Sequence, residues 1–211
     1  YQASVRHTRT IENLSHAYQL YSPVVRLFKK WLDKHLLLSH LDEELVELIA
    51  MKPFVDYTPF NVPGSLQNGF LKVLRFISQW NWKEDPLILD FVKPGTENEN
   101  SGDISNGELT SSTLKKLSER LTLQQYKAIQ SNFANIRNSD PNGVHLQYFV
   151  ASRNDPSGIL YSSGIPLPIA TRLTALAKIA TNIISTHGFN NQTIDLLFTP
   201  GLKDYDFVVQ M

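Results

Sequence analysis

Helical periodicity of the apolar residues constrains the fold of this chain more than any other feature of its sequence. Ser22-Pro23 predicts a helix start, because serine is a favoured N-cap and proline fits the first helical turn. From Val24 to Leu36, apolar residues recur at the spacing of a buried helix face. The same kind of spacing predicts further helices over about 11–20, after His40, after Ser65, from Thr122 and over 168–187.

Prolines and short apolar runs interrupt this pattern and predict the remaining structure. Pro53, Pro59 and Pro63 predict an irregular loop between two helices. Short apolar runs predict strands over 145–151, 158–161, 194–198 and 205–209, and the run 87–89 predicts either a strand or an extended packing segment. Two of these strands flank the turn 154–158, which favours a mainly antiparallel sheet. The expected fold class is therefore α+β, with a helical domain followed by a smaller α+β domain.

A change of composition near the middle of the chain indicates how it is organised. The stretch 95–112 carries Glu97, Glu99, Asp103 and Glu108 with no lysine or arginine, which is typical of a solvated loop. We expect a helical domain over 1–138 that contains this acidic loop, and a terminal α+β domain over 139–211. The chain starts without methionine and stops directly after an apolar run, so we expect it to be a fragment of a longer protein.

Composition and charge exclude several broad classes of protein. The chain has 211 residues, of which 42% are hydrophobic, so it is long and apolar enough to fold as a globular protein. No apolar run approaches the roughly 20 residues that span a bilayer, so no membrane contact is expected. The 20 basic and 20 acidic residues balance, which argues against a protein that coats nucleic acid. Without cysteine, disulfides and thiolate metal sites are excluded.

The residues that could carry catalysis form no complete motif. Asp204 and Asp206 would point the same way on a strand, as the metal-binding carboxylates of nucleotidyltransferases do. That motif also needs a Gly-Ser turn about a dozen residues upstream, and residues 191–195 lack one. His35 and His40 are not spaced for one helix face, and the other histidines are scattered. We therefore predict no catalytic residue, no metal site and no cofactor.

Two surface features could bind a partner, and each has a plain structural alternative. A row of four basic residues lies opposite the apolar face of its helix, namely Arg26, Lys29, Lys30 and Lys34. It is either ordinary solvated surface or a contact for RNA or an acidic protein, and its modest charge favours a protein or mixed partner. Trp80 and Trp82 could stack on bases, but at the end of an apolar helix a place in the core is favoured.

Several longer motifs together resemble one protein family. They are Ser22-Pro-Val-Val-Arg-Leu-Phe-Lys-Lys-Trp31, His35-Leu-Leu-Leu-Ser-His40, Pro59-Phe-Asn-Val-Pro-Gly-Ser65, Trp80-Asn-Trp-Lys-Glu-Asp-Pro-Leu-Ile-Leu-Asp90, Phe149-Val-Ala-Ser-Arg-Asn-Asp-Pro-Ser-Gly158 and Lys203-Asp-Tyr-Asp206. In these stretches the chain resembles the nucleolar RNA-associated protein (Nrap) family. The resemblance covers nearly the whole chain except the segment 95–112.

The resemblance implies both a fold and a function. It implies the family's second, C-terminal poly(A)-polymerase/oligoadenylate-synthetase-like helical domain, similar to the central domain of poly(A) polymerases, followed by the terminal α+β domain. The family resembles tandem, degenerate nucleotidyltransferases, and in active relatives the metal-binding carboxylates lie on a preceding palm domain that is not in this chain. It implies a non-catalytic scaffold of the small-subunit processome in the nucleolus, acting in 18S pre-rRNA processing and ribosome biogenesis. The implied partners are an RNA-recognition-motif-like protein, casein kinase 2, other UTP-C components and pre-rRNA. The alternative is the C-terminal nucleotide- or RNA-binding part of an active nucleotidyltransferase.

Overall fold

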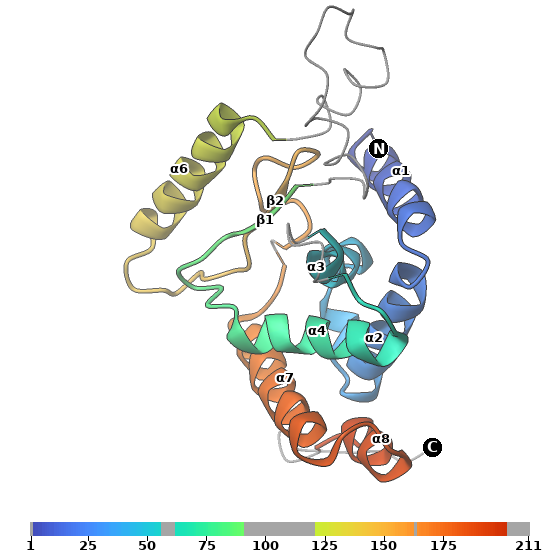
Figure 1. Cartoon of the computed structure of the whole chain (residues 1–211). Helices are drawn as coiled ribbons and strands as arrows, with labels where there is room; N and C mark the ends of the chain where they lie inside the picture. The colour runs from blue at the N-terminus through green and yellow to red at the C-terminus, as the bar shows by residue number, and fades with distance from the viewer. Residues whose placement is uncertain (1, 56–61, 91–120, 163, 202–211) are drawn as a thin grey trace, which may run out of the picture.

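The computed structural model describes residues 2–55, 62–90, 121–162 and 164–201, and this part of the chain is mainly helical (Figure 1). The acidic segment 95–112 and the predicted strand 205–209 lie outside the described residues. The helices are α1 (Gln2–Ala17), α2 (Tyr21–Lys34), the short 3₁₀ helix η1 (Leu38–His40), α3 (Glu43–Val55), α4 (Leu66–Gln79), α6 (Leu123–Ser139), α7 (Leu167–His187) and α8 (Asn191–Leu197). The strands are β1 (Leu87–Leu89) and β2 (Val150–Ser152).

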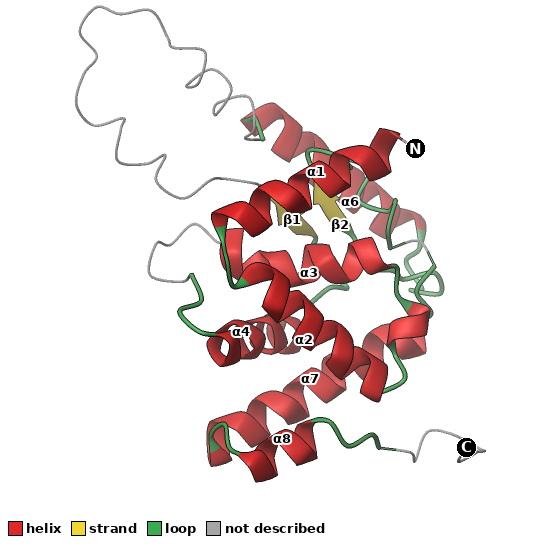
Figure 2. Cartoon of the chain, turned by 90° about the vertical axis from the view of Figure 1, so that its right-hand side faces the viewer, coloured by secondary structure: helices red, strands yellow, loops and turns green. Residues whose placement is uncertain are grey.

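Helices α2, α3, α4 and α7 pack into the main body of the molecule, with α1 at one end and α8 at the other (Figure 2). Their inward faces form one apolar core that includes Phe28, Trp31 and Phe70. Gly69 allows α4 to approach α2 closely, because a Cβ atom there would lie 2.5 Å from Val24 Cγ2. The prediction of a helical first half with its core on these faces is confirmed.

Two of the predicted helix starts are confirmed by their capping bonds. The Ser65 hydroxyl accepts a hydrogen bond from the backbone N–H of Asn68 at the start of α4. At the start of α6, Thr122 and Gln125 bond to each other's backbone N–H groups in a capping box. Both caps satisfy N–H groups that have no partner inside the helix.

Three other helix boundaries differ from the prediction. The helix predicted over about 11–20 is α1, which begins at Gln2 and ends at Ala17. Leu20, not Ser22, is the N-cap of α2, and the Ser22 hydroxyl lies 2.9 Å from the hydroxyl of Ser15 instead of capping. Pro53 does not end α3, which continues to Val55. The Pro53 side chain is buried, and this packing offsets the backbone hydrogen bond that proline cannot donate.

The sheet is parallel, so the prediction of a mainly antiparallel sheet is wrong. Leu87 pairs with Val150, and Leu89 pairs with Ser152. Both strands have three residues, and α6 lies between them in the sequence. A parallel pair needs a long crossover connection, and in this chain the crossover contains a helix, whereas a hairpin turn joins only antiparallel strands.

The segment after β2 forms a turn around Asp155 rather than the predicted strand over 158–161. The Asp155 carboxylate is buried and accepts hydrogen bonds from the backbone N–H groups of Ser157, Gly158 and Leu160. The Gly158 carbonyl accepts from Val150 N–H at 2.8 Å, but no strand follows. The predicted strand over 145–151 is likewise reduced to β2, because only residues 150–152 face a partner strand.

The predicted strand over 194–198 is a helix. Asn190 caps α8 by accepting a hydrogen bond from Thr193 N–H at 2.8 Å. This bond starts a helical turn at Asn191, and Gly188 ends the preceding helix α7 with a φ of 70°. A short apolar run is compatible with either a strand or a buried helix segment, and here the Asn190 cap favours the helix.

The division of the chain at residue 138 stays a prediction. Contacts cross that position in the described structure, because β1 pairs with β2 and α4 packs along α7. Ile129 and Phe133 of α6 form a second small cluster with Phe149 and Ala151 beside the sheet. Among the described residues, no helix is both long enough and apolar enough to cross a lipid bilayer.

Candidate interaction surface on α2

Helix α2 separates apolar and basic residues onto opposite sides. Its buried side chains are Tyr21, Val24, Val25, Phe28, Trp31 and Leu32. The other side exposes Arg26, Lys30 and Lys34, which are spaced four residues apart and so lie on successive turns. We call these three residues the basic stripe from here on.

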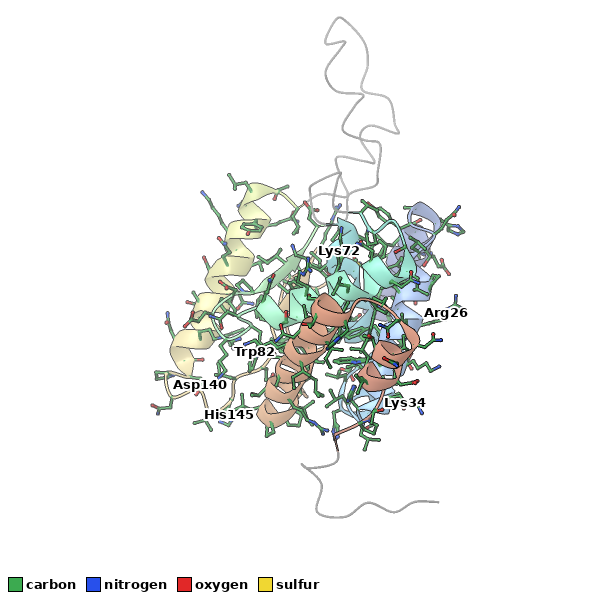
Figure 3. The ribbon with its side chains drawn as sticks, turned by 60° about the horizontal axis from the view of Figure 1, so that its bottom comes forward. Arg26, Lys34, Lys72, Trp82, Asp140 and His145 are labelled. Carbon is green, nitrogen blue, oxygen red and sulfur yellow. The ribbon has the colours of Figure 1, made fainter. Side chains whose placement is uncertain are left out.

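The basic stripe forms no ion pair with any acid that the structure describes. Asp33 is the acid on the same exposed face of α2, so this face carries three positive charges and one negative charge. Arg26 and Lys34 project from one side of the molecule, and Asp140 and His145 lie at the opposite edge (Figure 3). The stripe is therefore an accessible surface with a modest positive charge.

Lys29, the fourth predicted contact residue, has a different environment. Its side chain is only 22% exposed, and its Nζ lies 3.0 Å from Glu47 Oε1 and 3.2 Å from Glu43 Oε2. His7 Nε2 lies 2.9 Å from the other carboxylate oxygen of Glu47, so Glu47 links α1, α2 and α3. Lys29 thus holds the helices together, and we leave it out of the basic stripe.

The pKa shifts of this cluster follow from burial and pairing. Burial disfavours the charged form of Lys29, but the hydrogen bonds and charges of Glu47 and Glu43 outweigh it and raise the pKa of Lys29. Burial also disfavours ionisation of Glu47, yet hydrogen bonds from His7 and Lys29 lower its pKa. Lys29 and Glu47 therefore stay charged and paired at neutral pH.

Helix α2 ends in a Schellman motif with leucine at the position that glycine usually fills. Leu36 N–H donates to Asp33 O and Leu37 N–H donates to Leu32 O, both at 2.9 Å. Leu36 adopts a φ of 56°, in the left-handed region, and 49% of the residue is exposed. Leu37 and Leu32 are fully buried and make the apolar contact that accompanies this motif.

The end of α2 is joined to the end of α8 by a buried histidine. His35 Nε2 lies 3.0 Å from the carbonyl oxygen of Leu197, and no described residue forms a hydrogen bond with Nδ1. The ring packs edge-on against Trp31, with ring centroids 4.9 Å apart. Burial lowers the pKa of His35, and the nearby charge of Arg172 adds to this effect although the bond to Leu197 opposes it.

Trp80 and Trp82 belong to the core, as the favoured alternative predicted. Trp80 is 8% exposed, and its ring nitrogen donates to the carbonyl of Asp85 at 2.9 Å. Both indoles pack against the ring of Tyr148, at centroid distances of 5.0 and 5.2 Å. Neither ring offers a free face for a nucleotide base.

The histidines and aspartates considered for chemistry are not brought together in the described structure. His35 is buried beneath α8, whereas His40 is exposed in η1. Asp204 and Asp206 lie outside the described residues. Within the described ranges, no three His, Asp or Glu side chains are arranged so that they could hold a metal ion.

Sequence reasoning missed two exposed leucines near the basic stripe. Leu36 continues the apolar spacing of α2, so periodicity alone placed it in the core. Leu196 is 59% exposed on α8, in a run that the sequence suggested was a strand. A glycine at position 36 would have signalled the helix end, but the chain has leucine there.

Comparison with curated proteins finds relatives that carry related names. The chain is 73% identical over 214 residues to "U3 small nucleolar RNA-associated protein 22" of Saccharomyces cerevisiae and 28% identical to the protein of the same name in Schizosaccharomyces pombe. Both matches cover 100% of this chain and 17% of the relative. It is 26% identical to mouse "Nucleolar protein 6" over 97% of this chain and 15% of that protein. The chain thus spans about a sixth of the length of these relatives.

The family described as "Nrap protein PAP/OAS1-like domain 5" matches residues 18–200. The matched range contains every described helix and strand from α2 to α8. It also contains the basic stripe and both exposed leucines. The predicted resemblance is therefore confirmed: this chain belongs to the Nrap family and matches its fifth PAP/OAS1-like domain.

Proposed function

We propose that this chain is a non-catalytic binding part of a nucleolar scaffold that acts with U3 small nucleolar RNA in ribosome biogenesis. The observation that carries the proposal is 73% identity, over the whole chain, to a protein named for its association with that RNA. The vertebrate relatives carry the name of a nucleolar protein, which supports the same compartment. In this role the chain serves the small-subunit processome during maturation of 18S pre-rRNA.

The proposed lack of catalysis rests on the sequence around Asp204 and Asp206. No Gly-Ser turn stands a dozen residues upstream to hold a triphosphate. The test is incubation of the chain with RNA, ribonucleoside triphosphates and magnesium or manganese. We expect no extension of the RNA 3′ end. Extension that Asp206→Ala abolishes would contradict this part of the proposal and favour an active nucleotidyltransferase.

We further propose that the basic stripe is the part of this chain that contacts the assembly. Its support is the exposure of Arg26, Lys30 and Lys34 without an acidic partner in the described structure. An RNA-recognition-motif-like protein, casein kinase 2 and other UTP-C components remain the proposed partners, with pre-rRNA as a further contact.

The experiment tests this chain within a full-length relative. The matching region of the Saccharomyces cerevisiae relative is replaced by this chain, and U3 RNA is measured after affinity purification of the hybrid. We expect recovery equal to that of the unaltered relative. Loss of U3 RNA despite normal hybrid abundance would contradict the proposed function.

A charge-matched pair of variants tests the surface in the same hybrid. One variant carries Gln at Arg26, Lys30 and Lys34. The control carries Gln at Arg9, Lys127 and Lys178, which are also exposed and include one arginine and two lysines. We expect a several-fold loss of U3 RNA in the first variant alone. Equal recovery with both variants would contradict a role for the basic stripe.

A further inference from the structure

The first observation is the strained and exposed leucine at the end of α2. Left-handed backbone costs a non-glycine residue about 1–2 kcal/mol. Leu36 holds this conformation at a φ of 56°. Its side chain gains little burial in return, because 49% of the residue is exposed. Glycine would form the same Schellman motif without strain, so packing within this chain does not explain why the position holds a leucine.

A second exposed leucine lies at the same end of the molecule. The hydrogen bond from His35 Nε2 to Leu197 O joins the end of α2 to the end of α8. Leu36 directly follows His35 in the sequence, and Leu196 directly precedes Leu197. Leu196 is 59% exposed. The joined helix ends therefore carry two apolar side chains that the described structure leaves open to solvent.

The basic stripe leads along α2 to these leucines. Arg26, Lys30 and Lys34 follow one another at successive helical turns, and Lys34 is two residues before Leu36. Arg26 and Lys34 project from the same side of the molecule, away from Asp140 and His145 (Figure 3). The surface thus combines a row of positive charges with an apolar end.

We infer that this surface docks an acidic segment of a partner protein, with carboxylates along the basic stripe and an apolar side chain on Leu36 and Leu196. The inference rests on the proposed function and specifies the class of partner. Nucleic acid fits the surface less well, because three cations opposed by Asp33 neutralise few phosphates. Leucines also lack the aromatic faces on which unpaired bases stack.

The test measures binding of a synthetic probe to the full chain. The probe is a fluorescein-labelled peptide of about twelve residues that combines glutamates with a few leucines, long enough to follow three helical turns. A matched peptide replaces its leucines with alanine, and labelled oligouridine of similar length serves as the nucleic acid. Fluorescence anisotropy gives the affinities at low and moderate salt. We expect the leucine-containing peptide to bind most tightly.

Variants at Leu36 separate binding from stability. Leu36→Gly removes the strain, so the melting temperature should stay level or rise, while affinity for the peptide falls about tenfold for the lost apolar contact. Leu36→Met keeps the apolar bulk and should retain the affinity. Unchanged affinity of Leu36→Gly for the peptide would overturn the inference, because a purely structural leucine predicts that result.

Charge variants test the other half of the surface. Replacing Arg26, Lys30 and Lys34 with Gln should lower the affinity for the leucine-containing peptide by about tenfold or more. It should also remove most of the salt dependence of that affinity. The control with Gln at Arg9, Lys127 and Lys178 should bind as the parent does. Equal losses in the two variants, or tighter binding of oligouridine than of the peptide, would overturn the inference.

The peptide experiment tests the inferred class of partner, and the hybrid experiment tests the proposed function, so either claim can be wrong while the other holds. If the hybrid recovers U3 RNA but the peptide does not bind, the proposed function stands and the inferred partner class is wrong. If the peptide binds as expected but the hybrid recovers no U3 RNA, the surface is real and the proposed function is wrong.

Discussion

Gly158 occupies a position that glycine alone fills without strain. Its φ of 73° is left-handed, and a Cβ atom there would overlap the ring of Phe149. Gly158→Ala should therefore lower the free energy of unfolding by about 2–4 kcal/mol, from backbone strain plus overpacking. Urea unfolding of the two proteins measures this. Gly164→Ala is the control, because its Cβ would meet no atom within 4 Å and the change should be nearly neutral. Equal stability of all three proteins would contradict the described turn.

His35 should make stability depend on pH. Because burial lowers its pKa in the folded chain, the unfolded chain binds a proton more readily and protonation favours unfolding. The resulting stability is fully present above the unfolded pKa of about 6.5 and declines as pH falls toward the lower folded pKa. Urea unfolding between neutral and mildly acidic pH should show a smaller decline for His35→Gln than for the parent. Parallel pH profiles would contradict a buried neutral His35.

At the scale of single residues, burial was easier to predict than exposure. Trp80 and Trp82 follow an apolar helix, and both lie in the core as expected. Leu36 continues the same kind of apolar stripe, yet it lies past the end of its helix and is exposed. Lys29 looked like its basic neighbours, but Glu43 and Glu47 reach it from α3. Such differences depend on tertiary neighbours, which the spacing of residues along one helix does not report.

Helix α6 is joined to the rest of the molecule by an apolar cluster and by the side chain of Arg137. Its guanidinium donates hydrogen bonds to the backbone carbonyls of Lys83, Trp82 and Gln147 at 2.8–3.0 Å. It also lies over the ring of Phe133, 4.7 Å from the centroid. This one side chain therefore ties α6 to the segments before β1 and β2.

Replacing Arg137 should loosen α6 selectively. Lysine cannot reproduce the planar fork of donors, so Arg137→Lys should cost about 1–3 kcal/mol. Hydrogen exchange should accelerate in α6 more than in α2, α4 and α7, which do not depend on these bonds. Lys127→Gln, an exposed change on the same helix, is the control. Uniform acceleration across all the helices would contradict this local role.

At the scale of elements, caps and periodicity predicted the long helices well, and short apolar runs were ambiguous. Ser65, Thr122 and Gly188 mark helix ends where the structure has them. The run 194–198 belongs mostly to α8, because Asn190 caps a helical turn there. The parallel pairing of β1 with β2 joins segments about 60 residues apart. Their sequences contain no signal that specifies such a partner, because strand direction depends on how the chain crosses between them.

At the scale of the whole molecule, the helices present the basic stripe on a rigid support. The opposite face of α2 is buried, and Lys29 and His35 fix the helix to α3 and α8. We therefore expect the stripe and the two exposed leucines to keep their spacing when a partner binds. Our central claim is that this surface is covered when the chain is part of its assembly.

Lysine footprinting tests that claim most directly. The isolated chain and the purified hybrid assembly are labelled with an amine-reactive reagent, and modification is measured by mass spectrometry. Lys127 and Lys178, exposed elsewhere on the molecule, are internal controls. We predict that labelling of Lys30 and Lys34 falls several-fold on assembly while the controls change little. Undiminished labelling of Lys30 and Lys34 in the assembly would contradict the claim.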